Sequence, residues 1–385
     1  MPKPPQISHH AASLSAQVYG GLAARAKQMP GPVYALNVGD TYREPLLEAR
    51  AEAQLSREHA RLHNYSPVQG EPALIDAIVE RARRRHGAAL EPSRVQVTLG
   101  ATGGLSAVAA ALLEAEDEVI VLAPYWPLIR GIIAGRGAKA VEVPFYDRCG
   151  AAGFDVRAAL DAALSDRSVA LYMGSPNNPT GRVHSEAIQA ALCAFAERHG
   201  LWIFSDEAYE ELSFRPPPTP AWISHPERTL SCHTVSKSYG LAGARVGWVY
   251  GPESALGAVR GAQTFLTYCA AKPMQLAAAA ALRLGDDWIL EARAAYEAAG
   301  SAAATRLGLA APQGGTFLFF DVTGWLREGE SMQGFLERAL GQGVLLTPGA
   351  VSGAAYENWV RLCFTAVPAQ DLERATTQLA ALMPG

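Results

Sequence analysis

The chain has 385 residues, of which 49% are hydrophobic and 18% charged, and 33 basic against 37 acidic side chains leave a net charge of −4. This balance argues against nucleic acid or a membrane surface as a partner, and the length favours a large domain with a smaller one. Five cysteines without CxxC spacing indicate reduced thiols and no metal site, and no apolar signal core or 18-residue apolar span is seen, so we expect a cytoplasmic protein.

The first elements in chain order lead into a glycine. Residues 33–37 favour a short strand that runs into Gly39, where a backbone without Cβ can lie close to a ligand or simply turn. Residues 64–87 open with a turn and continue as an amphipathic helix. Tyr65 stands just before the turn, where it can also be a packed loop aromatic. We expect the arginine run at 81–85 to lie mostly on its solvated face.

A strand, a glycine turn and a helix follow over residues 95–113. Gly100, Ala101 and Thr102 stand where the strand at 95–99 gives way to a strong helix former. Such a turn offers free N–H groups and the positive end of the helix dipole, which together favour an anion. The pattern is neither GxGxxG nor a GK[ST] phosphate loop, so nucleotide binding has no support.

Six more apolar segments favour strands, and most are separated by helical or loop crossovers. They are 119–123, 139–144, 168–173, 201–205, 229–233 and 246–250. With 95–99 they predict an α/β fold in which a mostly parallel seven-stranded sheet is flanked by helices. Right-handed crossovers would bring the loops to one edge of this sheet, where ligands of open α/β folds bind.

Three of these loops carry side chains suited to an aromatic ligand. Trp126 can stack on a ring, although tryptophans also serve as core or rim residues, and Asn178 lies in a proline-stiffened loop with an amide to donate. Asp206 ends the apolar strand LWIF, where a buried carboxylate needs a cation; a helix cap or a surface acid is the alternative. Tyr209 follows three residues later.

Within residues 231–248, Lys237 follows two hydroxyl residues, Thr234 and Ser236. After it comes a loop with two glycines that ends at Arg245. Such a segment can hold a phosphate and present an amine beside it. An amine forms a Schiff base with an aldehyde, and pyridoxal phosphate carries both an aldehyde and a phosphate. We therefore predict this cofactor.

The C-terminal part predicts a smaller α+β domain. Residues 312–322 turn and then form a strand, further strands lie at 344–346 and 359–364, and a helix at 368–383 closes the chain. Arg361 is the one charged residue of WVRLCF, and its guanidinium suits either a substrate carboxylate or a structural salt bridge. We place the large domain at 40–280 and the small domain at 1–39 and 281–385.

Four segments resemble the signatures of fold-type I pyridoxal-phosphate aminotransferases of classes I and II, in the family's order and at about its spacing. They are SPNNPTG (175–181), SDEAY (205–209), the lysine segment and VRLCFT (360–365). Thr234 stands where the family usually has Ser or Gly, and it keeps a hydroxyl. Ser352 stands where an aromatic often follows the Pro-Gly turn, which leaves the substrate pocket less defined.

The resemblance implies a role for each candidate residue. Lys237, Asp206 and Tyr209 would be catalytic, with Asp206 on the protonated ring nitrogen and Tyr209 on the 3′ oxygen. Cofactor contacts would come from Gly100, Ala101, Thr102, Trp126, Asn178, Asp206, Tyr209, Thr234, Ser236, Lys237 and Arg245, and from Tyr65 across a homodimer with shared sites. Gly39, Trp126, Asn178 and Arg361 would contact the substrate, with Arg361 on its α-carboxylate.

The implied activity is ping-pong transfer of an amino group between an L-amino acid and a 2-oxo acid. A lyase, decarboxylase or oxidase on the same scaffold could use the same residues. An aminotransferase-like transcription regulator is a remote alternative, because about 35 residues before the first strand are too few for a winged helix. The helix after Thr102 carries no Lys or Arg that would pair with a dicarboxylate, which favours a neutral or aromatic donor.

Overall fold

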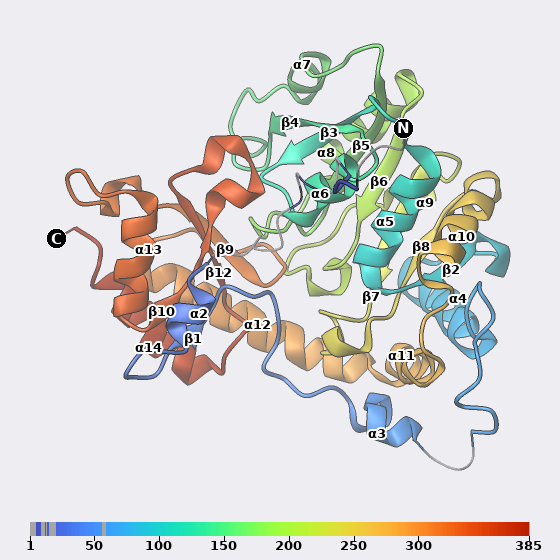
Figure 1. Cartoon of the computed structure of the whole chain (residues 1–385), viewed down its shortest axis with the longest axis horizontal. Helices are drawn as coiled ribbons and strands as arrows, with labels where there is room; N and C mark the ends of the chain where they lie inside the picture. Colours follow the sequence, from blue (N-terminus) through green and yellow to red (C-terminus); the bar gives the residue numbers. More distant parts are fainter. Residues whose placement is uncertain (1–4, 9–11, 13, 15–20, 56–58, 385) are drawn as a thin grey trace.

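The computed structural model describes residues 5–8, 12, 14, 21–55 and 59–384. A large sheet with helices on both faces forms one part of the molecule, and a smaller sheet with its own helices forms the other (Figure 1). None of the helices in these ranges is long and apolar enough to cross a membrane.

The large sheet has seven strands in the order β2-β8-β7-β6-β5-β3-β4, and only β8 runs antiparallel to its two neighbours. The strands are β2 (Val95–Thr98), β3 (Glu118–Ala123), β4 (Lys139–Pro144), β5 (Ser168–Gly174), β6 (Trp202–Asp206), β7 (Thr229–Thr234) and β8 (Gly247–Tyr250). All seven predicted strands are present within one or two residues of their expected bounds. The predicted fold class is confirmed.

Alternation along the strands explains why both faces of this sheet are covered. Val119 and Val121 of β3 pack with α5, α6 and α10, whereas Ile120 and Leu122 pack with α7 and α8 on the opposite face. These helices are α5 (Gly100–Leu112), α6 (Leu128–Ala134), α7 (Val156–Asp161), α8 (Glu186–Arg198) and α10 (Glu253–Thr267). Beside β2 and β8, α4 (Pro72–His86) and α11 (Lys272–Leu284) form a further apolar cluster.

The smaller part is built on an antiparallel sheet in the order β11-β12-β9, comprising β11 (Thr347–Pro348), β12 (Trp359–Cys363) and β9 (Phe317–Asp321). A parallel pair, β1 (Tyr34–Ala35) with β10 (Val344–Leu345), ties the N-terminal segment to it. Its core also takes residues from α12 (Asp286–Arg306), α13 (Met332–Gly341) and α14 (Ala369–Ala380).

Short helices α2 (Ala23–Ala26), α3 (Ala51–Gln54) and α9 (Ala221–Ser224) complete the α-helices of the described residues, and short 3-10 helices lie between several of the elements. The pairing of β1 with β10 agrees with the assignment of the N-terminal segment to the small domain, but the boundaries at 39/40 and 280/281 stay a prediction. The part of that assignment covering 1–4, 9–11, 13 and 15–20 falls outside the described residues.

The arginine run of α4 does not lie wholly on a solvated face. Arg83 and Arg84 are exposed, but Arg81 is buried, with 4% of its surface accessible, and Arg85 is partly buried. The expectation was wrong for these two because both guanidinium groups form ion pairs with Glu210 and Glu211. A buried arginine needs such partners, and they lie more than a hundred residues away in sequence.

Candidate active site

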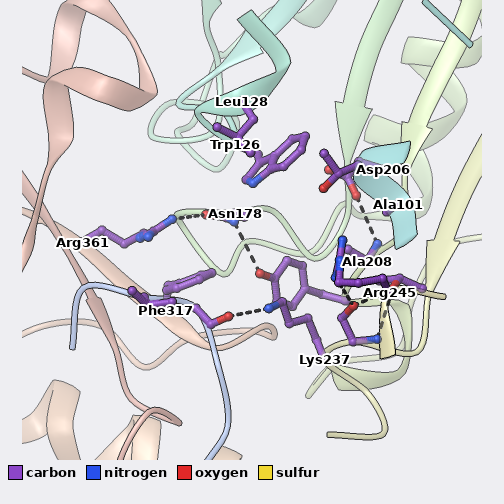
Figure 2. A pocket seen from close by; sticks show the side chains of 16 residues that line it. Ala101, Trp126, Leu128, Asn178, Asp206, Ala208, Lys237, Arg245, Phe317 and Arg361 are labelled. Carbon is purple, nitrogen blue, oxygen red and sulfur yellow. Dashed lines mark hydrogen bonds between the residues drawn. The ribbon is translucent and has the colours of Figure 1, made fainter. Parts of the chain in front are cut away.

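A cavity of about 210 Å³ opens where β5, β6 and β7 end, beside the N-terminus of α5 and facing the small sheet. It collects nearly all the candidate residues: Gly39, Ala101, Thr102, Trp126, Asn178, Asp206, Tyr209, Thr234, Ser236, Lys237, Arg245 and Arg361. Figure 2 shows Lys237, Arg245, Asp206 and Arg361 converging from different elements. The loops meet because the carboxyl ends of neighbouring parallel strands share one edge.

The Lys237 amine points into this cavity and donates to the backbone carbonyl of Gly39. Burial lowers the pKa of Lys237, and Arg245 and Arg361 also lower it, whereas Asp40 opposes them. A lowered pKa leaves more of the amine neutral near pH 7, the form that can act as a nucleophile or base. A side chain at Gly39 would strike the Phe317 ring, because its Cβ would lie 2.5 Å from the ring.

One end of the cavity is suited to a phosphate. The N-terminus of α5 is not capped by a side chain, so the first amides of this 13-residue helix are available to an anion. Arg245, exposed and in the left-handed region with φ 53°, reaches across to Gly100, where a Cβ would lie 2.7 Å from the guanidinium. The hydroxyls of Thr234 and Ser236 lie 2.8 Å apart beside it.

Asp206 stands at the opposite end of the cavity from Arg361, with no ion pair to any described residue (Figure 2). Tyr172 donates its hydroxyl to this carboxylate at 2.8 Å, and the Ala208 amide donates at 3.2 Å. Burial raises the pKa of Asp206, although both hydrogen bonds act against the shift. The site therefore holds a carboxylate that a cationic ligand group would stabilise.

Asn178 connects the ring side of the cavity to Arg361. Its amide nitrogen donates to the Tyr209 hydroxyl at 3.4 Å, and its amide oxygen accepts from Arg361 Nη1 at 3.1 Å. Arg361 Nη2 also donates to the Asn37 carbonyl at 2.8 Å, and the guanidinium lies 4.3 Å from the centre of the Phe317 ring. These contacts fix the guanidinium in a plane that a carboxylate can approach.

The sequence prediction did not include four residues that line the cavity, namely Val38, Leu128, Ala208 and Phe317, nor Tyr172 behind Asp206. Val38 and Ala208 are next in sequence to the predicted residues Gly39 and Tyr209, and this proximity is the only sign by which the sequence could have indicated them. Phe317 follows the Gly314-Gly315 pair at the start of an apolar strand, which only indicated a turn. Nothing in the sequence pairs Tyr172 with Asp206, because adjacent strands bring them together.

Tyr65 and Gly100 do not line the cavity of this chain. Gly100 packs against the Arg245 guanidinium instead. Tyr65 is 82% exposed and packs edge-on against Tyr268, with 5.0 Å between the ring centres. Its predicted contact is with a second subunit.

The α/β sheet, the small sheet and the lysine, aspartate and arginine at their junction define an enzyme of the aspartate-aminotransferase-like fold type I. The chain belongs to the aminotransferase class I and II family, whose model matches residues 32–379. An arginine–pyruvate transaminase of Pseudomonas aeruginosa is 32% identical over 361 residues, covering 90% of this chain and 88% of the relative.

Solved structures agree with this assignment. Aspartate aminotransferase from Thermus thermophilus with maleate has a TM-score of 0.89 and 26% identity, covering 98% of this chain and 100% of that one. N-succinyldiaminopimelate aminotransferase from Mycobacterium tuberculosis has a TM-score of 0.87 and 26% identity at the same coverage. The chain is therefore a transaminase that moves an amino group between an amino acid and a 2-oxo acid, as predicted.

Proposed function

We propose that this transaminase works with pyridoxal phosphate, which its family generally uses, in the cavity around Lys237. The observation that carries the proposal is the Asp206 carboxylate, whose pKa is raised by burial and which forms no ion pair with the described residues. A protonated pyridine nitrogen would supply the missing cation. The amides that open α5, together with Arg245, Thr234 and Ser236, suit the phosphate, and Tyr65 would approach it from a second subunit.

Other candidate residues would hold the ring and its substituents. Trp126 lines the cavity with a face broad enough for stacking, and Asn178 and Tyr209, already in contact with each other, can donate to the 3′ oxygen. When bound, pyridoxal phosphate draws electrons from the α carbon of an amino acid and so makes its proton acidic.

The chain itself supplies the proton transfer and the orientation. The Lys237 amine, with its lowered pKa, accepts the α-carbon proton and returns it as an acid. Arg361, held by Asn178 and the Asn37 carbonyl, binds the α-carboxylate and so fixes which bond faces Lys237.

Two half-reactions test the proposal. Protein loaded with pyridoxal phosphate and given one L-amino acid should release one equivalent of 2-oxo acid per site and then stop. A second 2-oxo acid should restore the absorbance spectrum of the protein as first loaded with pyridoxal phosphate. Steady-state kinetics should be ping-pong. Continuous release of ammonia or hydrogen peroxide would instead identify a lyase or an oxidase.

We also propose that the active unit is a homodimer whose sites are shared through Tyr65. An exposed aromatic outside its own cavity, beside the exposed Tyr268, supports a contact with another subunit. A cytoplasmic location is proposed on the grounds that all five cysteines are free.

Hybrid dimers test the shared site. Tyr65→Asp would set a carboxylate against the phosphate, and Lys237→Ala removes the essential amine, so each variant alone should be nearly inactive. A hybrid of the two has one intact site and should recover about half of the wild-type activity per dimer if the two sites act independently. Inactive hybrids, alongside wild-type chains that regain activity after the same refolding, would contradict sharing.

A further inference from the structure

A buried charged cluster lies behind the cavity and none of the roles above uses it. We call it the Glu210 cluster; it consists of Arg81, Arg85, His86, Glu210, Glu211 and His233. Its central members are almost completely enclosed: Arg81 is 4% exposed, Glu210 7% and His233 1%. The cluster joins α4, the short 3-10 helix after β6 (Glu210–Leu212) and strand β7.

The Glu210 carboxylate links all three elements. One of its oxygens accepts from His233 Nδ1 at 2.8 Å and from Arg81 Nη2 at 3.1 Å. The other oxygen lies 2.8 Å from His86 Nε2. Glu211 accepts from Arg81 Nε at 2.9 Å, so the Arg81 guanidinium bridges two consecutive carboxylates.

The neighbours of the His233 ring determine its protonation. Because a carboxylate only accepts, Nδ1 must carry the proton toward Glu210, and Nε2, 2.9 Å from the Ser231 hydroxyl, can then accept from it. Burial lowers the pKa of His233 despite the nearby carboxylate. The ring is therefore neutral at pH 7, and it stacks on Trp248 at an angle of 2°.

Stability alone is a poor explanation for this arrangement, because burying several charges costs about as much as their pairing returns. The place of the cluster in the chain is more informative. Glu210 directly follows Tyr209 and lies four residues after Asp206, while His233 directly precedes Thr234 and lies four residues before Lys237. The backbone pairing of β6 with β7 ends at Asp206 and Cys232, and the Glu207 N–H donates to the Cys232 carbonyl at 2.9 Å. Beyond that point, the Glu210–His233 hydrogen bond joins the segment facing the cofactor ring to the segment facing its phosphate and aldehyde.

We propose that Glu210 and His233 are positioning residues whose hydrogen bond holds Asp206 and Tyr209 in register with Thr234 and Lys237. The inference rests on the proposed pyridoxal phosphate site. It predicts that the bond matters for cofactor affinity and turnover, beyond any effect on folding.

Two substitutions at one position separate the hydrogen bond from packing. His233→Leu fills much of the ring's volume but removes the donor, whereas His233→Asn places an amide N–H where Nδ1 stood. Neither residue can stack on Trp248 as histidine does. With the cofactor-free proteins, we expect the dissociation constant for pyridoxal phosphate to rise at least tenfold in His233→Leu and less than threefold in His233→Asn. The kcat should fall in parallel, with the KM for the amino acid little changed.

Glu210→Gln should behave like His233→Leu, because it weakens the acceptor. Glu330→Gln serves as the matched control: it alters another carboxylate–arginine pair, with Arg338, that does not line the cavity, and it should leave cofactor affinity unchanged. Melting temperatures would be recorded for every variant.

Equal cofactor affinity in folded His233→Leu, His233→Asn and wild type would overturn the inference while leaving the proposed function intact. If neither His233→Leu nor Glu210→Gln folds, the cluster is required for the fold itself and the positioning role is rejected. A wild-type protein that binds no pyridoxal phosphate would overturn both the inference and the proposed function.

Discussion

Asp206 and Glu210 are carboxylates four residues apart with opposite electrostatic surroundings. Burial would raise the pKa of Glu210, but the Arg81 cation and the hydrogen bond from His233 hold it well below its usual range. Asp206 receives only a hydroxyl and an amide, and its pKa is raised by burial. Glu210 is balanced by the chain's own arginines, whereas Asp206 is left for a cation that a ligand brings.

Among the variants considered, Asp206→Asn should have the largest effect, because it removes the carboxylate that is left for a ligand cation. The amide still accepts from Tyr172 but cannot balance a protonated ring nitrogen. We expect kcat/KM to fall by about 5 kcal/mol, roughly 10³- to 10⁴-fold, as for loss of one charge from a desolvated pair. Steady-state kinetics with saturating pyridoxal phosphate measures this loss.

The same variant should be no less stable than the wild type when the cofactor is absent, because the substitution removes a carboxylate that lacks an ion pair. Glu210→Gln should do the reverse and lower the melting temperature of the cofactor-free protein. Thermal unfolding of both variants checks this. If Asp206→Asn lost as much stability as Glu210→Gln, the two carboxylates would not differ in the way described.

Arg361→Lys tests the charged group that is predicted to bind the substrate carboxylate. Lysine keeps the charge but loses the planar fork that Asn178 and the Asn37 carbonyl orient. We expect a loss of about 2–3 kcal/mol in kcat/KM, mostly through a higher KM for the amino acid. An unchanged value would place the substrate carboxylate elsewhere.

Glu207 lies between Asp206 and Glu210 in the sequence, and its substitution should have the smallest effect, on the pH dependence of stability. Burial first and then Glu210 raise its pKa to about 8, although Ser205 donates to it. A pKa raised in the folded state contributes stability below the unfolded value, near pH 4.5, and this stability is lost as the pH rises through 8. Glu207→Gln should remove that dependence.

The stability advantage of Glu207→Gln over the wild type should therefore grow by about 1 kcal/mol between pH 6 and pH 8, less than full linkage allows because the side chain is partly exposed. Urea unfolding at several pH values measures it. A difference that does not change with pH would show that Glu207 titrates normally.

The sequence predicted the residues that face the cavity better than those behind it. Short motifs with chemistry that can be recognised locally contain Lys237, Asp206, Asn178 and Arg361. The alternation of strands with crossovers predicted a parallel sheet, and with it the edge of the sheet where most of these loops meet. Strand bounds were predictable because buried parallel strands form continuous apolar runs.

The Glu210 cluster could not be predicted in this way. Arg81 looked like one member of a solvated arginine run, and His233 looked like an ordinary strand residue. Only the tertiary structure brings Arg81 of α4 against Glu211 of a short 3-10 helix, 130 residues later in the sequence. Phe317 was missed for the same reason, since Gly39 and Arg361, which lie against its ring, are far from it in the sequence.

The most direct test of the central claim is to locate the cofactor. The cofactor-free protein would be loaded with one equivalent of pyridoxal phosphate, reduced with borohydride, digested and mapped by mass spectrometry, with and without prior Lys237→Ala substitution. We predict a single phosphopyridoxyl group on Lys237 that is absent from the variant. Labelling of Lys139 or Lys272 instead, or equal labelling of the wild type and the variant, would contradict the account.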